Sequence, residues 1–498
     1  MRNIAVINGT DLREPAFRPL RDGRSSFALA VQFALELPGV AETVVLLSRE
    51  TELPAGARPV VRASWTLASL LEQIAGAAEG FDHVCYLYGD CPFLDSAIAR
   101  RMQESHVRHW ADYTFADGYP AGVTVEILSR QTVGRLRAMA DGPEGQAAPR
   151  RDSLFTVIRK DINSFDIETE ISPTDMRLLR VSLTADTERN FLLLSRIVAA
   201  GAVTPEAAIR FLQDNPGAHR TLPAFFPVQV VEQCPQACTY CPYPRFAGDV
   251  LHRKGFMPVE AFAGLARKIS AFAGDAVIDI SLWGEPSLHP QVFDLIQAGR
   301  DTPGIELLIE TSGIGWPAGT FERIKAQGGT PPRWIVSLDA ATEPVYRALR
   351  GEGFAEATRT AEELLRLFPD RTWVQAVRMK ENEEELDTFY RQWKTRTENV
   401  IIQKYDSFHG TLPDRTVADF SPLKRFPCWH LKRDMAILLD GSVPLCREDV
   451  HTSVRLGNAF HDELAVIWDS AREIHRSHLS GTYPGICAAC DEYYTFNF

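Results

Sequence analysis

Short apolar runs alternate with amphipathic segments along the N-terminal part of the chain. The runs at residues 4–7, 43–47 and 83–87 contain few polar positions, and they predict strands buried on both faces of a parallel sheet. The amphipathic segments between them predict helices that cover this sheet. A turn-rich stretch at residues 214–220 ends the pattern. We therefore expect an α/β domain over residues 1–218.

The same alternation begins again after a group of cysteines near residue 240. It predicts a second α/β domain over residues 225–412, because strands that alternate with helices form parallel sheets. After Pro413 the chain becomes irregular, and we assign residues 413–498 to a small third domain. A length of 498 residues suits about three domains. The strands expected in the second domain are residues 277–280, 306–309, 334–338 and 373–377.

The net charge of -12 argues against a nucleic-acid or anionic-membrane partner, because phosphate surfaces are bound mainly by clustered Lys and Arg. The apolar stretch at the start of the chain is too short for a signal-peptide core, and no apolar run is long enough to span a membrane. We therefore expect a cytoplasmic protein. Nine cysteines in such a protein predict reduced thiols and metal ligands rather than disulfides.

Three cysteines, Cys234, Cys238 and Cys241, stand in the run Cys-Pro-Gln-Ala-Cys-Thr-Tyr-Cys. A 4Fe-4S cluster held by three thiolates keeps one iron open, whereas clusters that only relay electrons are usually closed by four cysteines. The alternative is a zinc site, which needs a fourth Cys or His ligand close by. The nearest candidate, His252, lies beyond a Pro-Tyr-Pro turn.

This loop, with Tyr240 before its last cysteine, resembles that of the radical S-adenosylmethionine (SAM) superfamily. The resemblance implies that SAM binds the open iron through its amino and carboxylate groups. It also implies reductive cleavage of SAM to methionine and a 5'-deoxyadenosyl radical, which takes a hydrogen atom from the substrate. The fold implied for the second domain is a partial (β/α)6 barrel.

Segments at the ends of the predicted strands resemble cofactor-binding segments of the same superfamily. Ser-Leu-Trp-Gly-Glu-Pro resembles the Gly-Gly-Glu-Pro segment that receives the methionine amino group, with Trp283 replacing the first glycine. Arg350 is implied to bind the methionine carboxylate, because a guanidinium donates two parallel hydrogen bonds. Each segment alone is also an ordinary turn or helix end, and their order after successive strands favours a site. The residues implied to bind the cofactor are Tyr240, Gly284, Glu285, Pro286, Ser312, Ser337, Asp339 and Arg350.

A second set of four cysteines lies in the C-terminal region and includes a close Cys-Ala-Ala-Cys pair. It resembles the auxiliary-cluster domains of the SPASM and twitch families, in a shortened form with one auxiliary 4Fe-4S cluster. A structural zinc site with four cysteines is the alternative, since the same ligand set suits either metal. The four residues are Cys428, Cys446, Cys487 and Cys490.

A fully ligated auxiliary cluster is expected to accept an electron rather than bind substrate. Such a role favours an oxidation in which a base removes a proton from the substrate radical. Asp449, close to Cys446, and Asp434 are candidate bases, although the pattern around each one alone favours an ordinary solvated acid. The segment of residues 403–408 follows another expected strand and is a candidate substrate wall.

Two aspartates in the N-terminal domain follow buried strands. Asp90 stands in Gly-Asp-Cys-Pro-Phe-Leu and Asp186 in Leu-Thr-Ala-Asp-Thr, and both resemble segments of nucleotidyltransferases that activate sugars with CTP. The resemblance implies a glycosyltransferase-A-like fold with Mg²⁺ on these carboxylates and CTP or a nucleotide sugar as ligand. A helix cap is the alternative role for Asp90. The first loop has Arg13 and Arg18 but lacks the lysine that grips a triphosphate.

The whole arrangement resembles the spiro-SPASM family. Our first hypothesis is a radical oxidoreductase acting on a sugar or nucleotide-activated small molecule, which the N-terminal domain makes or holds. The second is a maturase that oxidises a residue of a peptide or protein. A third makes the N-terminal domain a non-catalytic binding module. Each needs an electron donor such as flavodoxin or ferredoxin.

Overall fold

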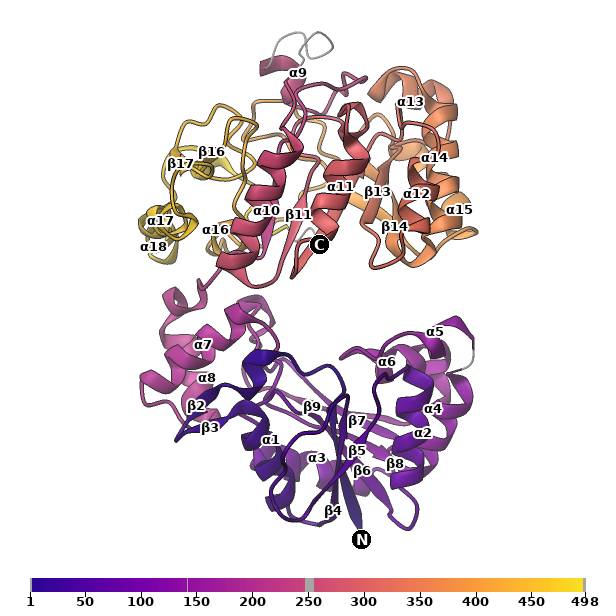
Figure 1. Cartoon of the computed structure of the whole chain (residues 1–498), viewed down its shortest axis with the longest axis vertical. Helices are drawn as coiled ribbons and strands as arrows, with labels where there is room; N and C mark the ends of the chain where they lie inside the picture. The colour runs from indigo at the N-terminus through magenta and orange to yellow at the C-terminus, as the bar shows by residue number, and fades with distance from the viewer. Residues whose placement is uncertain (1, 141, 247–254, 496–498) are drawn as a thin grey trace. The chain divides into compact units, whose positions relative to one another are not determined.

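The computed structural model describes residues 2–140, 142–246 and 255–495, and the chain forms two compact units that divide after Thr221 (Figure 1). The first unit ends close to the predicted boundary at residue 218. The second unit holds both the expected barrel and the C-terminal region, so these two parts pack as one body.

The first unit is built on a seven-stranded sheet in the order β5-β4-β1-β6-β8-β7-β9. Its centre confirms the predicted parallel strands, because β1 pairs in parallel with both β4 and β6. The short strand β8 runs antiparallel to β6 and β7, which the apolar pattern did not predict. The strands are β1 (Asn3–Gly9), β4 (Val40–Leu47), β5 (Ala57–Val61), β6 (His83–Tyr88), β7 (Tyr113–Asp117), β8 (Glu126–Ser129) and β9 (Ile167–Ile171).

Helices cover both faces of this sheet. Ala5 and Ile7 of β1 face one apolar core, and Ile4 and Val6 face the other, as the two-residue period of a strand requires. Side-chain oxygens accept backbone N–H groups at several helix starts, and Asp95 does so for α3. One face carries α1 (Ser26–Glu36), α3 (Ser96–Arg108), α7 (Glu188–Ala199) and α8 (Pro205–Asp214). The other carries α2 (Leu67–Ala77), α4 (Arg130–Met139) and α6 (Ser153–Ile158).

The second unit contains six parallel strands that pair in sequence order from β10 to β15. This open parallel sheet, with a helix after most strands, confirms the expected partial barrel. The strands are β10 (Phe225–Pro227), β11 (Ala276–Asp279), β12 (Ile305–Thr311), β13 (Arg333–Ser337), β14 (Thr372–Arg378) and β15 (Val400–Lys404). The helices are α10 (Val259–Ala273), α11 (Val292–Arg300), α12 (Thr320–Ala326), α13 (Glu343–Arg350), α14 (Phe354–Leu367) and α15 (Leu386–Lys394).

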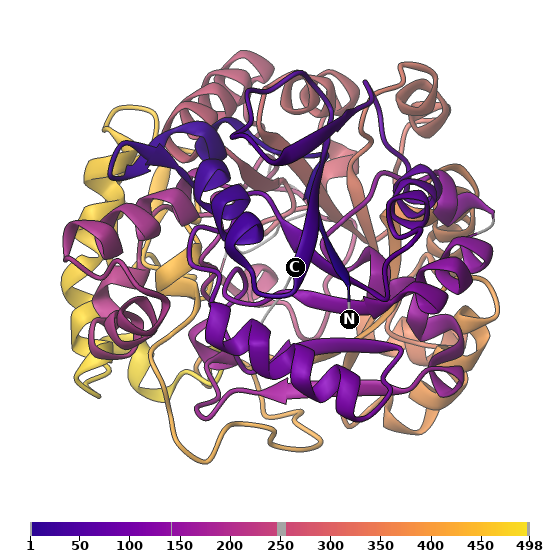
Figure 2. The ribbon, with the colours of Figure 1, turned by 90° about the horizontal axis from the view of Figure 1, so that it is seen from below.

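The C-terminal region lies against the first strand of the barrel, and it is coloured yellow in Figures 1 and 2. Met435 donates its N–H to the Phe225 carbonyl at 3.0 Å, and Ile437 donates to Pro227 at 2.8 Å. Trp468 packs into the same apolar core as α10. This region contains α16 (His430–Arg433), β16 (Ser442–Pro444), β17 (Arg455–Asn458), α17 (Leu464–Ser470) and α18 (Arg472–Leu479).

The described helices are short. At 15 residues, α10 is about 22 Å long, which is less than the hydrocarbon core of a bilayer. In the parts of the chain that the structure describes, no helix is long and apolar enough to cross a membrane.

Candidate functional site

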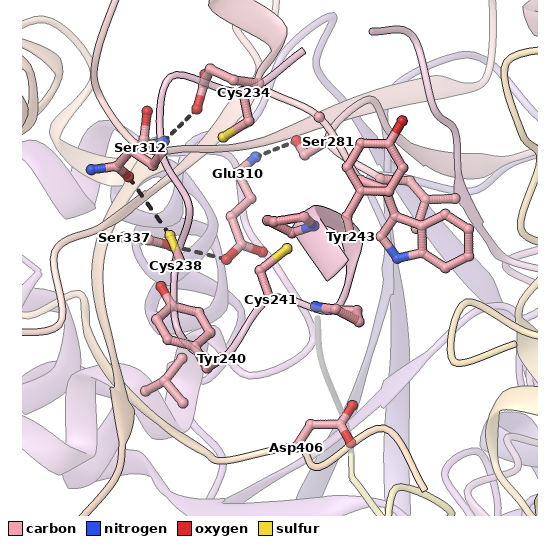
Figure 3. A pocket seen from close by; sticks show the side chains of 18 of the residues that line it. Cys234, Cys238, Tyr240, Cys241, Tyr243, Ser281, Glu310, Ser312, Ser337 and Asp406 are labelled. Carbon is pink, nitrogen blue, oxygen red and sulfur yellow. Dashed lines mark hydrogen bonds between the residues drawn. The ribbon is translucent and has the colours of Figure 1, made fainter. Parts of the chain in front are cut away.

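The carboxyl ends of the barrel strands surround a cavity of about 250 Å³ (Figure 3). In α/β barrels the loops at this end of the strands assemble the active site. The lining comes from the ends of all six strands, β10 to β15, from the cysteine loop and from neighbouring loops. The polar and cysteine side chains that line it include Cys234, Cys238, Cys241, Tyr240, Glu285, Glu310, Ser312, Ser337, Arg350, Lys404, Asp406 and Arg447.

The three cysteines of the loop lie around the same part of this cavity (Figure 3). The Cys241 N–H donates to the Cys238 carbonyl at 3.1 Å, and Thr239 donates to the Leu349 carbonyl at 2.9 Å, which ties the loop to α13. Burial raises the pKa of all three thiols, that of Cys241 to about 12. Thiolates in this environment need a positive partner, and a bound metal centre supplies one.

The separation of the thiols bears on the zinc alternative. Tetrahedral zinc with bonds of about 2.3 Å holds its sulfur ligands about 3.8 Å apart. Among the described residues, no three cysteine sulfurs lie within 4.8 Å of one another. The alternative fourth zinc ligand, His252, lies outside the described residues. The three sulfurs are therefore not gathered as closely as the ligands of a tetrahedral zinc ion.

The turn after β11 brings its backbone against the cysteine loop. The Glu285 N–H donates to the Gln233 carbonyl at 2.7 Å, and a Cβ on Gly284 would lie 2.0 Å from the Val231 oxygen. Only glycine fits such an approach. The Glu285 carboxylate accepts hydrogen bonds from the Thr311 hydroxyl at 2.6 Å and the Ser312 N–H at 2.7 Å. Glu285 therefore fixes the turn to the end of β12, and burial raises its pKa.

Trp283, which replaces a glycine of the resembled segment, lines the cavity. Its ring is nearly parallel to that of Tyr243, with centroids 6.3 Å apart, and its φ of 49° is in the left-handed region. The tryptophan therefore forms one wall of the cavity together with a residue of the cysteine loop.

Arg350 links the cysteine loop to the barrel strands. Its Nε donates to Gln236 Oε1 at 3.0 Å, and its Nη1 contacts both Tyr240 and Asp339. Asp339 is completely buried and also accepts the Val377 N–H at 2.7 Å. This network holds the guanidinium at the edge of the cavity.

The remaining predicted cofactor residues divide into two groups. Ser312 and Ser337 line the cavity, and the Ser337 hydroxyl donates to Glu310 Oε1 at 3.0 Å. Among the described lining residues, neither Pro286 nor Asp339 is present. Pro286 begins a short 3-10 helix, and Asp339 supports Arg350 from behind. We therefore regard these two residues as positioning groups.

Family models match the two halves of the second unit. Residues 228–392 match the radical SAM superfamily, and residues 428–491 match the SPASM iron-sulfur cluster-binding domain. An uncharacterized protein of Treponema pallidum (strain Nichols) is 40% identical over 358 residues, which cover 69% of this chain and 98% of that protein. The chain belongs to the radical SAM superfamily. It is a radical SAM enzyme that uses SAM and 4Fe-4S clusters.

Three further similar proteins match smaller parts of the chain. GTP 3',8-cyclase of Klebsiella pneumoniae (strain 342) is 26% identical over 164 residues, which cover 32% of this chain and 49% of that enzyme. The SAM-bound structure of Streptococcus suis SuiB has 13% identity and a TM-score of 0.42, over 53% of this chain and 70% of that one. A cytidylyltransferase from Leptospira borgpetersenii has 17% identity and a TM-score of 0.37, over 44% of this chain and 95% of that one.

The four cysteines of the SPASM domain all line one small cavity of about 20 Å³. Burial raises the pKa of each thiol, that of Cys428 to about 12. The thiol pKa of Cys446 is raised further by Glu448 and by neighbouring thiols of the set. The structure thus brings together cysteines that are spread over about sixty residues, in a cavity separate from the radical SAM cavity. They are Cys428, Cys446, Cys487 and Cys490.

The two predicted bases, Asp434 and Asp449, form contacts that hold the local structure. Burial raises the pKa of Asp434, but Arg433 and His430 outweigh it and hold the pKa at about 2. Asp449 accepts hydrogen bonds from backbone N–H groups of the loop after Cys446, including Ser453 at 2.8 Å. Neither aspartate is among the described residues that line the radical SAM cavity. We therefore do not retain them as bases.

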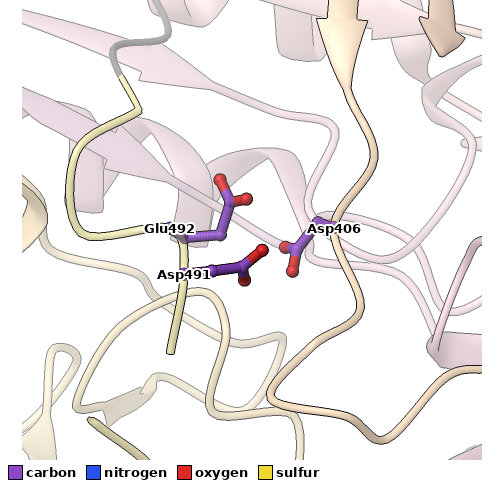
Figure 4. Close-up of side chains that lie close together, drawn as sticks. All are labelled: Asp406, Asp491 and Glu492. Carbon is purple, nitrogen blue, oxygen red and sulfur yellow. The ribbon is translucent and has the colours of Figure 1, made fainter. Parts of the chain in front are cut away.

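One of the acids that line the cavity is Asp406, which the sequence marked only as part of a possible wall. Asp406, Asp491 and Glu492 have carboxylate oxygens within 4.8 Å of one another (Figure 4). Lys404 Nζ donates to Asp491 at 2.8 Å and also contacts Glu492. Burial, with Glu448 and Glu492 nearby, raises the pKa of Asp406 well above its ordinary value. Its position just beyond the end of β15 is the sequence feature that could have identified Asp406 as a site residue.

In the first unit, the structure brings Asp90 and Asp186 together. The Ala185 N–H donates to the Asp90 carbonyl at 2.8 Å, and both carboxylates face Arg151. The helix cap proposed as an alternative belongs to Asp95, whose Oδ1 accepts the Ala97 N–H at 2.7 Å. Of the two arginines in the first loop, Arg18 forms ion pairs with Glu14 and Glu188.

Proposed function

We propose that this enzyme oxidises a small polar molecule, a sugar or a nucleotide-activated compound, in the radical SAM cavity. The observation that carries the proposal is the charged wall formed by Lys404, Asp406 and Arg447. Charged groups in a cavity of about 250 Å³ favour a compact polar substrate over an apolar one. The same wall adjoins the SPASM cysteines, because Glu448, next to Arg447, lines their cavity.

The lining of the site indicates which residues would hold the cofactors. Cys234, Cys238 and Cys241 would hold the first cluster, and the open backbone at Gly284 would receive the methionine amino group of SAM. Arg350 would bind the methionine carboxylate. When bound, the cofactors supply a 5'-deoxyadenosyl radical that takes a hydrogen atom from the substrate, and an auxiliary cluster that accepts the next electron.

Asp406 would take the proton that the substrate radical must lose. A carboxylate with a raised pKa is a better proton acceptor than an ordinary one, because its affinity for the proton is higher. Lys404 forms an ion pair with Glu492, and Arg447 forms one with Glu448, whereas Asp406 faces the cavity. Loss of one hydrogen atom, one proton and one electron amounts to a two-electron oxidation with a proton released.

The first test is anaerobic reconstitution with reduced flavodoxin or ferredoxin as the electron donor. We expect about eight iron atoms per chain and formation of 5'-deoxyadenosine from SAM. Zinc in place of iron, with no SAM cleavage, would contradict the proposal.

The second test identifies the class of substrate. Deuterated sugars, nucleotide sugars and peptides are supplied separately, and transfer of deuterium to 5'-deoxyadenosine is measured by mass spectrometry. Transfer from a sugar or nucleotide sugar supports the proposal. Transfer from peptides alone would replace it with the maturase function.

A further inference from the structure

The first unit contains an arginine where the resembled nucleotidyltransferases would require a metal ion. We infer that the guanidinium of Arg151 takes the position of a divalent cation between Asp90 and Asp186, so that this unit binds its ligand without Mg²⁺. The inference concerns the first unit alone and does not depend on the proposed radical reaction.

Arg151 reaches both carboxylates. Its Nη2 contacts Asp90 Oδ2, and its Nε lies 4.0 Å from Asp186 Oδ2. The two aspartates are far apart in the sequence and meet because β6 ends at Tyr88 and residue 185 pairs with the Asp90 carbonyl. The carboxylates therefore converge as a metal pair would, and a cationic side chain lies between them.

The arginine is held in this position by contacts of its own. Its guanidinium carbon lies 4.6 Å from the centre of the Tyr88 ring, which is a cation–π contact. The Tyr88 hydroxyl donates to the Arg151 carbonyl at 2.5 Å. Arg151 also lies two residues before the start of α6, whose apolar residues are buried in the core on that face of the sheet. Moving the guanidinium aside would break contacts at both ends of the residue.

The carboxylate oxygens have little capacity left for a metal. Asp186 Oδ1 already accepts hydrogen bonds from the Thr184 hydroxyl at 2.7 Å and from Asn190 Nδ2 at 2.8 Å. Asp90 is 5% exposed, so its side of the site leaves little room for the several waters that Mg²⁺ keeps in protein sites. A divalent cation would also be repelled by the fixed positive charge of Arg151.

The first loop supports the same conclusion independently. Arg18, one of the two cations that could bind a triphosphate there, forms ion pairs with Glu188 and with Glu14 at 3.1 Å, and its guanidinium lies over the Phe191 ring. An arginine that is already paired with two carboxylates attracts phosphates only weakly. The first unit is therefore a metal-independent binding module, and it does not transfer nucleotides from CTP.

The test is a titration of the full-length protein with Mn²⁺, read as loss of the free-ion signal in room-temperature electron paramagnetic resonance. We expect the wild type to bind no Mn²⁺ at this site. Arg151→Met keeps the length of the side chain and removes its charge, and we expect it to bind one Mn²⁺ with an affinity at least about tenfold above the weakest that the titration can detect. Arg150→Met, at the exposed neighbouring residue, is the matched control and should behave like the wild type.

Two further variants make every outcome decisive. Arg151→Lys retains a cation and should not gain Mn²⁺ binding, and Asp90→Asn added to Arg151→Met should abolish the gain. Wild-type binding that Asp90→Asn removes would overturn the inference. A folded Arg151→Met variant without Mn²⁺ binding would also overturn it. If that variant fails to fold by circular dichroism, the wild type and Asp90→Asn alone decide, because equal absence of binding in both supports the inference.

Discussion

The two units treat buried carboxylates at strand ends in opposite ways. In the second unit, Glu285 is held by uncharged donors, the Thr311 hydroxyl and the Ser312 N–H, and a cavity remains beside it. In the first unit, Asp90 is held by the charged guanidinium of Arg151. The carboxylate with uncharged partners therefore lies at a site that can receive a cofactor, whereas the carboxylate paired with a guanidinium lies at a site that is already filled.

The same difference is seen in the backbone. Gly284 removes a side chain so that two loops can approach each other, and cysteines line the space beside them. Arg151 does the reverse, because a long side chain enters the region between two acids. Motifs that resemble those of ligand-binding families can thus mark an open site or a filled one.

The largest expected effect comes from the cysteine loop. Cys238→Ala removes one ligand of the first cluster, and we expect 5'-deoxyadenosine formation to fall at least about 1000-fold. Cys85→Ala, at a buried thiol of the first unit, should leave the rate within about twofold after reconstitution. Comparable loss in both variants would show that the two units are not independent in function.

The next effect tests the acid wall. Asp406→Asn should lower product formation about 100-fold while SAM cleavage stays within about threefold, because the proton acceptor acts after hydrogen abstraction. In the wild type the raised pKa of Asp406 keeps it protonated at low pH, so product formation should rise as pH increases through that pKa. Equal loss of cleavage and product would contradict this role. Asp419→Asn, at an exposed acid, is the control.

A smaller effect is expected at the glycine turn. In Gly284→Ala the new Cβ would lie 2.0 Å from the Val231 oxygen, so the turn must move, and we expect about tenfold slower SAM cleavage and a loss of about 1–3 kcal/mol in stability. Gly76→Ala in α2 meets no atom within 4 Å and should be neutral or slightly stabilising. Urea unfolding and SAM-cleavage assays of the two variants test this comparison. Unchanged stability and cleavage in Gly284→Ala would contradict it.

The smallest effect on turnover is expected for Asp434→Ala, because this carboxylate lies outside the cavity lining. Its loss removes the buried contacts with Arg433 and His430 and should cost about 3–5 kcal/mol of stability, with turnover within about twofold. The pKa of Asp434 is about 2, below the ordinary 3.8, so its contribution is present above pH 3.8 and is lost as pH falls toward 2. The difference in unfolding free energy between wild type and variant should therefore shrink by roughly 2 kcal/mol as pH falls. A large loss of turnover with unchanged stability would return Asp434 to the list of bases.

The sequence predicted much of the scaffold because the governing signals are local. The run at residues 4–7 became β1, and cysteine spacing identified two sets that the fold brings to two cavities. The antiparallel β8 was missed because its four residues carry too short a pattern. Side-chain partners depend on distant residues, and this is why Arg151 was not expected beside Asp90. Asp449 was predicted as a base because it lies close to Cys446 in the sequence. Its carboxylate instead accepts hydrogen bonds from N–H groups of its own loop.

The pairing of residues 434–437 with β10 has a consequence for how the chain is made. Four backbone hydrogen bonds, between residues 224–229 and 433–437, cover the edge of the first barrel strand. An uncovered edge strand is a template for pairing with other chains. Residues 433–437 are synthesised some two hundred positions after β10, so a nascent barrel carries an open edge until they emerge. A chain truncated near residue 412 should therefore aggregate even with all six barrel strands present.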